Sequence, residues 1–294
     1  MIGAAAGAWV QDKTGRKWTL AGGSLISVLA IAVCYVSDTA ANPQSAFWGG
    51  KLLEGIAVGI IITSSQTYLS EVVPARLRGP VFALFPALTL VGQLVAAVAV
   101  LTQLDVPGKT SYRVALASEF PFSAIPLVLA FVLPESPAWL LHQDRIQDAR
   151  EAFRKLHGAQ VALAHQDLFE DMHRAVANER RAANDHKATY LECFRGTNLK
   201  RTLIVIFANC LEELFGLTLL GHVSYFLQMI GLSHGASFII LILGVVLGLI
   251  ANIGSFWTLL KFGRRLLILV TLSIVSIFWG TMGIAGCFSG VVVA

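Results

Sequence analysis

The sequence predicts an all-α fold in which a bundle of helices crosses a lipid bilayer several times. Two compositional observations lead to this class: 55% of the 294 residues are hydrophobic and only 14% are charged, whereas a soluble domain is about 25% charged. The third observation is that long stretches carry no charge, and a bilayer core of about 30 Å needs roughly 20 apolar residues of helix. A soluble core of this composition would lack a polar coat, so we expect a polytopic transmembrane bundle.

The apolar runs place the helices in order along the chain. Residues 1–11 have the composition of a span but supply only about 16 Å of helix, which is half of one. Seven full spans are then expected at residues 18–37, 47–70, 80–103, 114–134, 202–228, 236–260 and 266–290. The uncharged run 214–260 is too long for one helix, and its "GLSHGAS" segment, residues 231–237, is a turn signal that divides it in two.

Basic residues set the predicted orientation of these spans. Of the 22 lysines and arginines, only Lys51, Lys109 and Arg113 fall in loops on one side. The others fall in loops that alternate with those, which the positive-inside rule assigns to the cytoplasm. Both ends of the chain are therefore expected to face outward.

Residues 135–201 form the one substantial soluble segment. Ser136 is a predicted helix N-cap with Pro137 at the first helical position, and Gly158 is a predicted stop. Between them, Ile146, Ala149 and Phe153 share one helical face together with Leu156. The segment is either a cytoplasmic helical clamp or a linker between two bundles.

Other chemistry has no support in the residues. The four cysteines are scattered without ligand spacing, and there is no Walker motif, metal-ligand cluster or Ser/His/Asp set. We therefore expect no enzyme, no metal and no cofactor. The formal net charge of +4 reflects the loops described above and not a nucleic-acid partner.

Four motifs that follow one another in a fixed order indicate a resemblance to a known family. They are "WVQDKTGRKW" (residues 9–18), "TYLSEVVPARLRG" (67–79), "PESPAWL" (134–140) and "KFGRR" (261–265). Together they resemble the sugar porter family of the major facilitator superfamily. The segments "GQL" (92–94) and "ATYLECFRGTNLKRT" (188–202) are most similar to those of fungal maltose/α-glucoside permeases.

The resemblance implies a domain organisation. Placed on the family's twelve helices, the chain runs from late helix 2 to helix 9, so we expect a bundle truncated at both ends. Residues 1–134 would form the N-terminal transmembrane half (partial helix 2 to helix 6), residues 135–201 the cytoplasmic helical loop, and residues 202–294 a partial C-terminal half (helices 7 to 9).

The same resemblance implies a cytoplasmic gate. In the family, charges in these motifs close the inner side of the transporter, and the alternative role is simple positive-inside anchoring. The matching positions in this chain are Asp12, Lys13, Arg16, Glu71, Arg78, Glu135, Arg264 and Arg265. By itself, "DKTGRK" needs Gly15 for a tight turn, while Asp12 and Arg16 can form charge-assisted bonds at helix ends.

The expected substrate positions depart from the family. Sugar porters hold polyols with amides, and Glu212 and Glu213 stand where their helix 7 has a Gln-Gln pair. Thr218 and Asn252 complete the candidate set. An ionisable residue near mid-membrane costs about 2.5 kcal/mol or more and usually serves a function. Neighbouring residues diverge by about 100° on a helix, so we expect Glu212 to contact substrate or a proton and Glu213 to pack against a helix.

Two other membrane carboxylates need an account. Glu54 follows Lys51 by three positions, which predicts an i,i+3 ion pair. Glu119 is either a proton-coupling candidate or an interfacial carboxylate. The Gly55–Gly59 and Gly244–Gly248 pairs have the spacing that lets helices approach closely, and helix packing is their expected role.

The resemblance implies a multi-pass plasma-membrane protein that transports α-glucosides or hexoses together with protons. The alternatives are an exporter of a small metabolite, or a sensor-like or non-functional transporter fragment. The expected partners are a small-molecule substrate, a proton and the lipid bilayer.

Overall fold

The computed structural model describes residues 1–104, 106, 108, 110–158, 166–185, 193–214 and 221–292. A few side chains within these ranges, among them those of Glu212, Glu213 and Arg264, are outside the description. Every regular element among the described residues is a helix. Two compact units divide the chain: residues Met1–Leu84 with Val98–Lys187, and residues Phe85–Ala97 with Ala188–Ala294.

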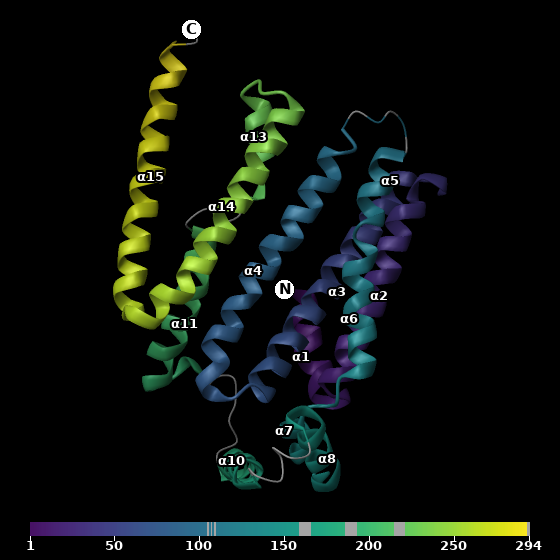
Figure 1. Ribbon diagram of the computed structural model, residues 1–294, viewed down its shortest axis with the longest axis vertical. Helices are drawn as coiled ribbons and strands as arrows, with labels where there is room; N and C mark the ends of the chain where they lie inside the picture. Colours follow the sequence, from purple (N-terminus) through teal and green to yellow (C-terminus); the bar gives the residue numbers. More distant parts are fainter. Residues whose placement is uncertain are drawn as a thin grey trace. The chain divides into compact units, whose positions relative to one another are not determined.

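The first unit holds the first half of the predicted bundle and the soluble helices (Figure 1). Its elements are α1 (Ile2–Thr14), α2 (Arg16–Val36), the short 3₁₀ helix η1 (Ser37–Thr39), α3 (Pro43–Val72), α5 (Thr110–Ala117), α6 (Phe120–Val132), α7 (Pro137–His142), α8 (Ile146–His157) and α10 (Gln166–Asp185). Helix α4 (Ala75–Leu101) contributes residues to both units.

The second unit contains α11 (Gly196–Leu214), α13 (Val223–Met229), α14 (His234–Lys261) and α15 (Arg264–Val292). The predicted turn lies where expected, because α13 ends at Met229 and α14 begins at His234. The single helix predicted over 202–228 is divided in the structure between α11 and α13, and residues 215–220 lie outside the description.

Among the described residues, six helical segments are long and apolar enough to cross a membrane. They are Arg16–Thr39, Pro43–Val72, Leu77–Leu101, Thr110–Val132, His234–Ser255 and Arg265–Ile284. Helix α1 has 13 residues, as expected for half a span. The fourth segment is divided into α5, which ends at Ala117, and α6, which begins at Phe120. The sequence did not predict this break. Pro121 in the first turn of α6 lacks an N–H and therefore cannot continue the ladder of α5.

Glycines bring α1 and α2 close to α3. A Cβ on Gly59 would lie 2.8 Å from the Ala4 nitrogen, and one on Gly50 would lie 2.5 Å from the Cys34 Sγ. The predicted packing role is thus confirmed for Gly59. Nothing lies within 4 Å of such an atom on Gly55, so that glycine makes no close approach.

The soluble helices α7, α8 and α10 share a small apolar core. It contains Trp139, Leu140, Leu141, Ala149, Ala152, Phe153, Phe169 and Val176. Ser136 caps α7 by accepting from the Trp139 N–H, and Gly158 ends α8 at a φ of 80°, both as predicted. The single helix expected from Pro137 onward is instead broken at residues 143–145, where Asp144 adopts a φ of 60°.

Candidate functional site: the charged network at the α1–α2 turn

The site is built around the turn between α1 and α2. Gly15 joins the helices with a φ of 97°, which favours glycine. A Cβ at this position would lie 2.3 Å from Glu135 Oε2 and 3.3 Å from the Trp139 ring. The predicted tight turn is confirmed, and it lets a carboxylate from a distant segment reach the start of α2.

Arg16 forms the buried centre of the network. Its Nε donates to both carboxylate oxygens of Glu71, at 3.0 and 3.1 Å, and its second amino nitrogen lies 2.8 Å from Glu71 Oε1. The guanidinium also donates to the Gln11 carbonyl at 3.1 Å and lies 3.5 Å from Asp12 Oδ1. Because Arg16 is only 8% exposed, these charge-assisted contacts are stronger than surface ion pairs.

Glu135 caps the start of α2 from another segment. Its Oε1 accepts from the backbone N–H of Arg16 at 2.9 Å, of Lys17 at 3.1 Å and of Ser136 at 3.0 Å. The first N–H groups of a helix have no partner within the helix and carry partial positive charge. The N-cap residue of α2, Gly15, supplies no side-chain bond, so Glu135 takes that role across 119 positions.

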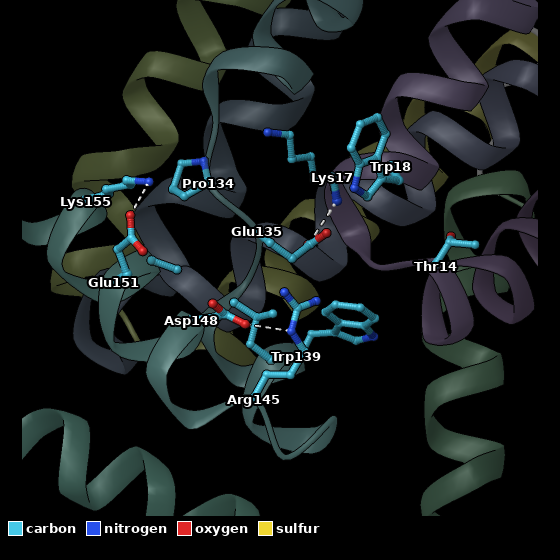
Figure 2. A pocket seen from close by; sticks show the side chains of 12 residues that line it. Thr14, Lys17, Trp18, Pro134, Glu135, Trp139, Arg145, Asp148, Glu151 and Lys155 are labelled. Atoms are coloured by element: carbon cyan, nitrogen blue, oxygen red, sulfur yellow. Dashed lines mark hydrogen bonds and ion pairs between the residues drawn. The ribbon is translucent and has the colours of Figure 1, made fainter.

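Two further bonds tie the α6–α7 junction to the membrane helices. The Trp139 indole donates to the Asp12 carbonyl at 3.1 Å, and the Tyr68 hydroxyl donates to the Pro134 carbonyl at 3.1 Å. Glu135, Trp139 and the α1–α2 turn lie close together in Figure 2. The soluble helices are therefore fixed to α1, α2 and α3 by side chains and not only by the chain connection.

The predicted gate residues separate into two groups. The structure brings Asp12, Arg16, Glu71 and Glu135 into one network. Lys13 instead lies over the Trp9 ring, at 3.8 Å, and Arg78 donates to the Val73 carbonyl at 3.1 Å. Arg264 and Arg265 begin α15 in the second unit, and the Arg264 side chain lies outside the description. Whether any of these residues acts as a gate remains a prediction.

The predicted substrate residues all belong to the second unit. Glu212 and Glu213 lie in the last turn of α11, their side chains lie outside the description, and Thr218 lies among the undescribed residues 215–220. Asn252 is on α14, where its Oδ1 is buried and has no hydrogen-bond partner in the described part of the chain. A free amide oxygen of this kind can accept a bond from a hydroxyl group.

The carboxylates of α3 and α5–α6 surround one lysine. Lys51 Nζ lies 2.8 Å from Glu54 Oε2, which confirms the predicted i,i+3 pair, and 3.6 Å from Glu119 Oε2. One amino nitrogen of Arg113 also donates to both carboxylate oxygens of Asp38, at 2.9 and 2.8 Å. Sequence reasoning missed the Lys51–Glu119 and Asp38–Arg113 contacts, because residues so far apart in sequence give no spacing signal.

A family model described as "Sugar (and other) transporter" matches residues 1–293. The chain belongs to this family. It is thus a multi-pass membrane protein of a transporter family and not an enzyme, and that family is the sugar porter family of the major facilitator superfamily.

Curated relatives match nearly all of this chain. An Aspergillus fumigatus protein named "MFS transporter fmqE" is 26% identical over 96% of the chain and 50% of its own length. The "General alpha-glucoside permease" of Saccharomyces cerevisiae is 24% identical over 90% of the chain and 44% of its own length. The chain spans about half the length of these relatives.

The fold of this chain also matches a solved structure. The proton:xylose symporter XylE bound to 6-bromo-6-deoxy-D-glucose superposes with a TM-score of 0.73 at 20% identity. The match covers 90% of this chain and 57% of XylE. This likeness shows that the helical fold is that of the major facilitator superfamily.

Proposed function

We propose that the chain takes part in moving a sugar or related polyol across a membrane. The proposal rests on family membership over residues 1–293 and on the names of relatives, which include a permease for α-glucosides and a myo-inositol transporter. Among these substrates, the sequence motifs favour an α-glucoside or a hexose, with a proton as the coupled ion.

The observation that carries the proposal is the Arg16–Glu71–Glu135 network. Secondary transporters work by alternating access, in which one bundle rocks against another around a fixed site. The network lies within the first unit, where it holds the soluble helices against α1, α2 and α3. We infer that this attachment holds in one state of the transporter and breaks in the other. Charge-assisted bonds at helix ends suit this role, because water can replace them when the helices separate.

The substrate would be held by polar groups of the second unit. Asn252 has a buried acceptor oxygen without a described partner, and Glu212, Glu213 and Thr218 lie on or just beyond α11. Hydroxyl groups of a polyol both donate and accept, so they can pair with an amide and with a carboxylate. A carboxylate at this position would also be able to carry the coupled proton.

Uptake into proteoliposomes tests the proposal. The purified chain would be reconstituted as it stands and supplied with radiolabelled glucose, maltose or myo-inositol under an inward proton gradient. We expect saturable uptake of at least one of the three, and its loss when a protonophore collapses the gradient.

The control is counterflow from vesicles preloaded with unlabelled sugar, which detects exchange without a gradient. Counterflow without gradient-driven uptake would retain sugar transport and reject proton coupling. The absence of both, with protein shown to be folded by circular dichroism, would reject the proposed transport activity of the chain.

A further inference from the structure

A pocket of about 340 Å³ lies where the α1–α2 turn, the α6–α7 junction and α8 meet (Figure 2). Cavities of this size are large enough to hold a small ligand. All of its lining residues belong to the first unit. The pocket adjoins the charged network through Glu135, but most of its wall comes from residues that the network does not use.

The rim of the pocket has the character of a membrane–water interface. Trp18, which lines the pocket, is 57% exposed, and Phe131 at the end of α6 is 61% exposed. Their rings meet edge to face at 6.3 Å, and Lys17 Nζ donates to the Phe131 carbonyl at 3.2 Å. An exposed tryptophan beside a lysine at the end of an apolar span marks headgroup depth.

Three cations from separate segments line the pocket: Lys17 at the start of α2, Arg145 in the α7–α8 turn, and Lys155 on α8. The lining also contains three acids, Glu135, Asp148 and Glu151, so its formal charges balance. The surrounding segments carry more cations than acids. The first loop has Lys13, Arg16 and Lys17 against Asp12, and the α7–α8 turn with α8 has Arg145, Arg150, Arg154 and Lys155 against Asp144, Asp148 and Glu151.

The acids that line the pocket hold these cations weakly. Arg145 pairs with Asp148 at 2.7 Å and Lys155 pairs with Glu151 at 2.7 Å, and the four side chains are at least half exposed. Exposed pairs of this kind contribute little and exchange readily. Glu135 Oε1 is already engaged by three backbone N–H groups, whereas its Oε2 is buried and has no hydrogen-bond partner in the part of the chain that the structure describes. The cations are therefore available to a stronger anion.

We propose that this pocket binds the headgroup of an anionic phospholipid from the cytoplasmic leaflet. The phosphate would lie among Lys17, Arg145 and Lys155, and the acyl chains would run along the exposed rings of Trp18 and Phe131. Cations that are only weakly paired suit such lipids at the cytoplasmic surface, because that leaflet carries a negative potential. A sugar would use neither the three cations nor the apolar rim.

Native mass spectrometry of the delipidated protein tests the site. The protein would be titrated with phosphatidylserine, with phosphatidylcholine, and with the water-soluble headgroup glycerophosphoserine. We expect one tight phosphatidylserine adduct and much weaker binding of the other two. The double variant Lys17→Gln/Lys155→Gln should weaken the phosphatidylserine adduct about 30-fold, since each lysine near a membrane surface contributes about fivefold.

The matched control is Arg174→Gln, which removes one charge from a side chain on α10 that is 74% exposed and away from the pocket. It should leave phosphatidylserine binding unchanged, and Lys17→Arg/Lys155→Arg should retain it. Equal binding of phosphatidylserine and phosphatidylcholine, or equal losses in the double variant and the control, would overturn the site. Tight binding of glycerophosphoserine would overturn the lipid as its occupant. Because lipid retention is read directly, the result is independent of sugar transport.

Discussion

Arg16 and Glu71 form a shielded ion pair, 2.8 Å apart, although 55 positions separate them in the chain. Their side chains are only 9% and 18% exposed. The pair joins the first residue of α2 to the last turn of α3, at the end of the bundle that carries the soluble helices.

Replacing Arg16 by glutamine should lower the free energy of unfolding by about 3 kcal/mol, because Glu71 would keep its charge without a cation. Adding Glu71→Gln should recover part of that loss. Unfolding in mixed micelles would measure the free energy of unfolding of the two single variants and the double variant, which together form a double-mutant cycle. The control is Lys155→Gln, which breaks an exposed pair and should cost below about 1 kcal/mol. Strictly additive effects of the two buried substitutions would refute the pairing.

Gly59→Val should destabilise the contact between α1 and α3, whereas Gly55→Val should be tolerated. Both glycines lie on α3, but only Gly59 approaches the α1 backbone, with Ala4 nitrogen 2.8 Å from the position of a Cβ. Forcing extra atoms into a packed contact costs about 1–3 kcal/mol. Thermal unfolding in detergent would compare the two variants, and equal melting temperatures would show that α1 does not pack here.

The attachment of α10 should weaken at acid pH. Arg180 makes two hydrogen bonds to Asp144, and this guanidinium holds the pKa of Asp144 below its ordinary value. The ion pair therefore stabilises the contact above about pH 3.9, the usual aspartate pKa, and the stabilisation is lost as pH falls through the lower value. Hydrogen exchange of residues 166–185, corrected for intrinsic rates, should accelerate in that range.

Asp144→Asn should remove this acid dependence while keeping the backbone, because asparagine tolerates the φ of 60° found here. Asp148→Asn is the matched control, since Asp148 pairs with Arg145 and not with α10. If Asp148→Asn changed the exchange of α10 as much as Asp144→Asn, the assignment to Arg180 would be wrong.

Glu212→Gln should flatten the pH dependence of sugar uptake. A step governed by one proton changes by up to about tenfold per pH unit, and glutamine cannot titrate. Glu213→Gln is the neighbouring control, because the two residues diverge by about 100° around α11. Uptake profiles measured from pH 5 to pH 8 decide the matter: an unchanged Glu212→Gln profile, or the same change in both variants, argues against the role of Glu212.

Local patterns in the sequence predicted local structure. The uncharged runs located six segments able to span a membrane, the Lys51–Glu54 spacing predicted an ion pair, and Gly158 predicted the end of α8. The breaks were missed for equally local reasons. Asp144 adopts a left-handed conformation at a position where the sequence has no glycine to indicate it. Pro121 separates α5 from α6 in a segment that is hydrophobic throughout.

Contacts between distant residues had no such signal. Four of the charges in the network at the α1–α2 turn were expected to act together because of family resemblance, but the atoms through which they pair were not. Nothing in residues 12–17 indicates that Glu135 supplies the cap of α2, or that Lys17 turns toward Phe131. These contacts depend on how whole helices pack against one another, which the spacing of residues along the sequence does not predict.

The Glu135 cap couples two events that would otherwise be separate. If the soluble helices swing away from the bundle, Glu135 leaves with them, and the amides of Arg16 and Lys17 lose their acceptor. The opening turn of α2 would then fray in step with the departure. Deuterium uptake at those two amides would thus serve as a built-in reporter of detachment that needs no attached probe.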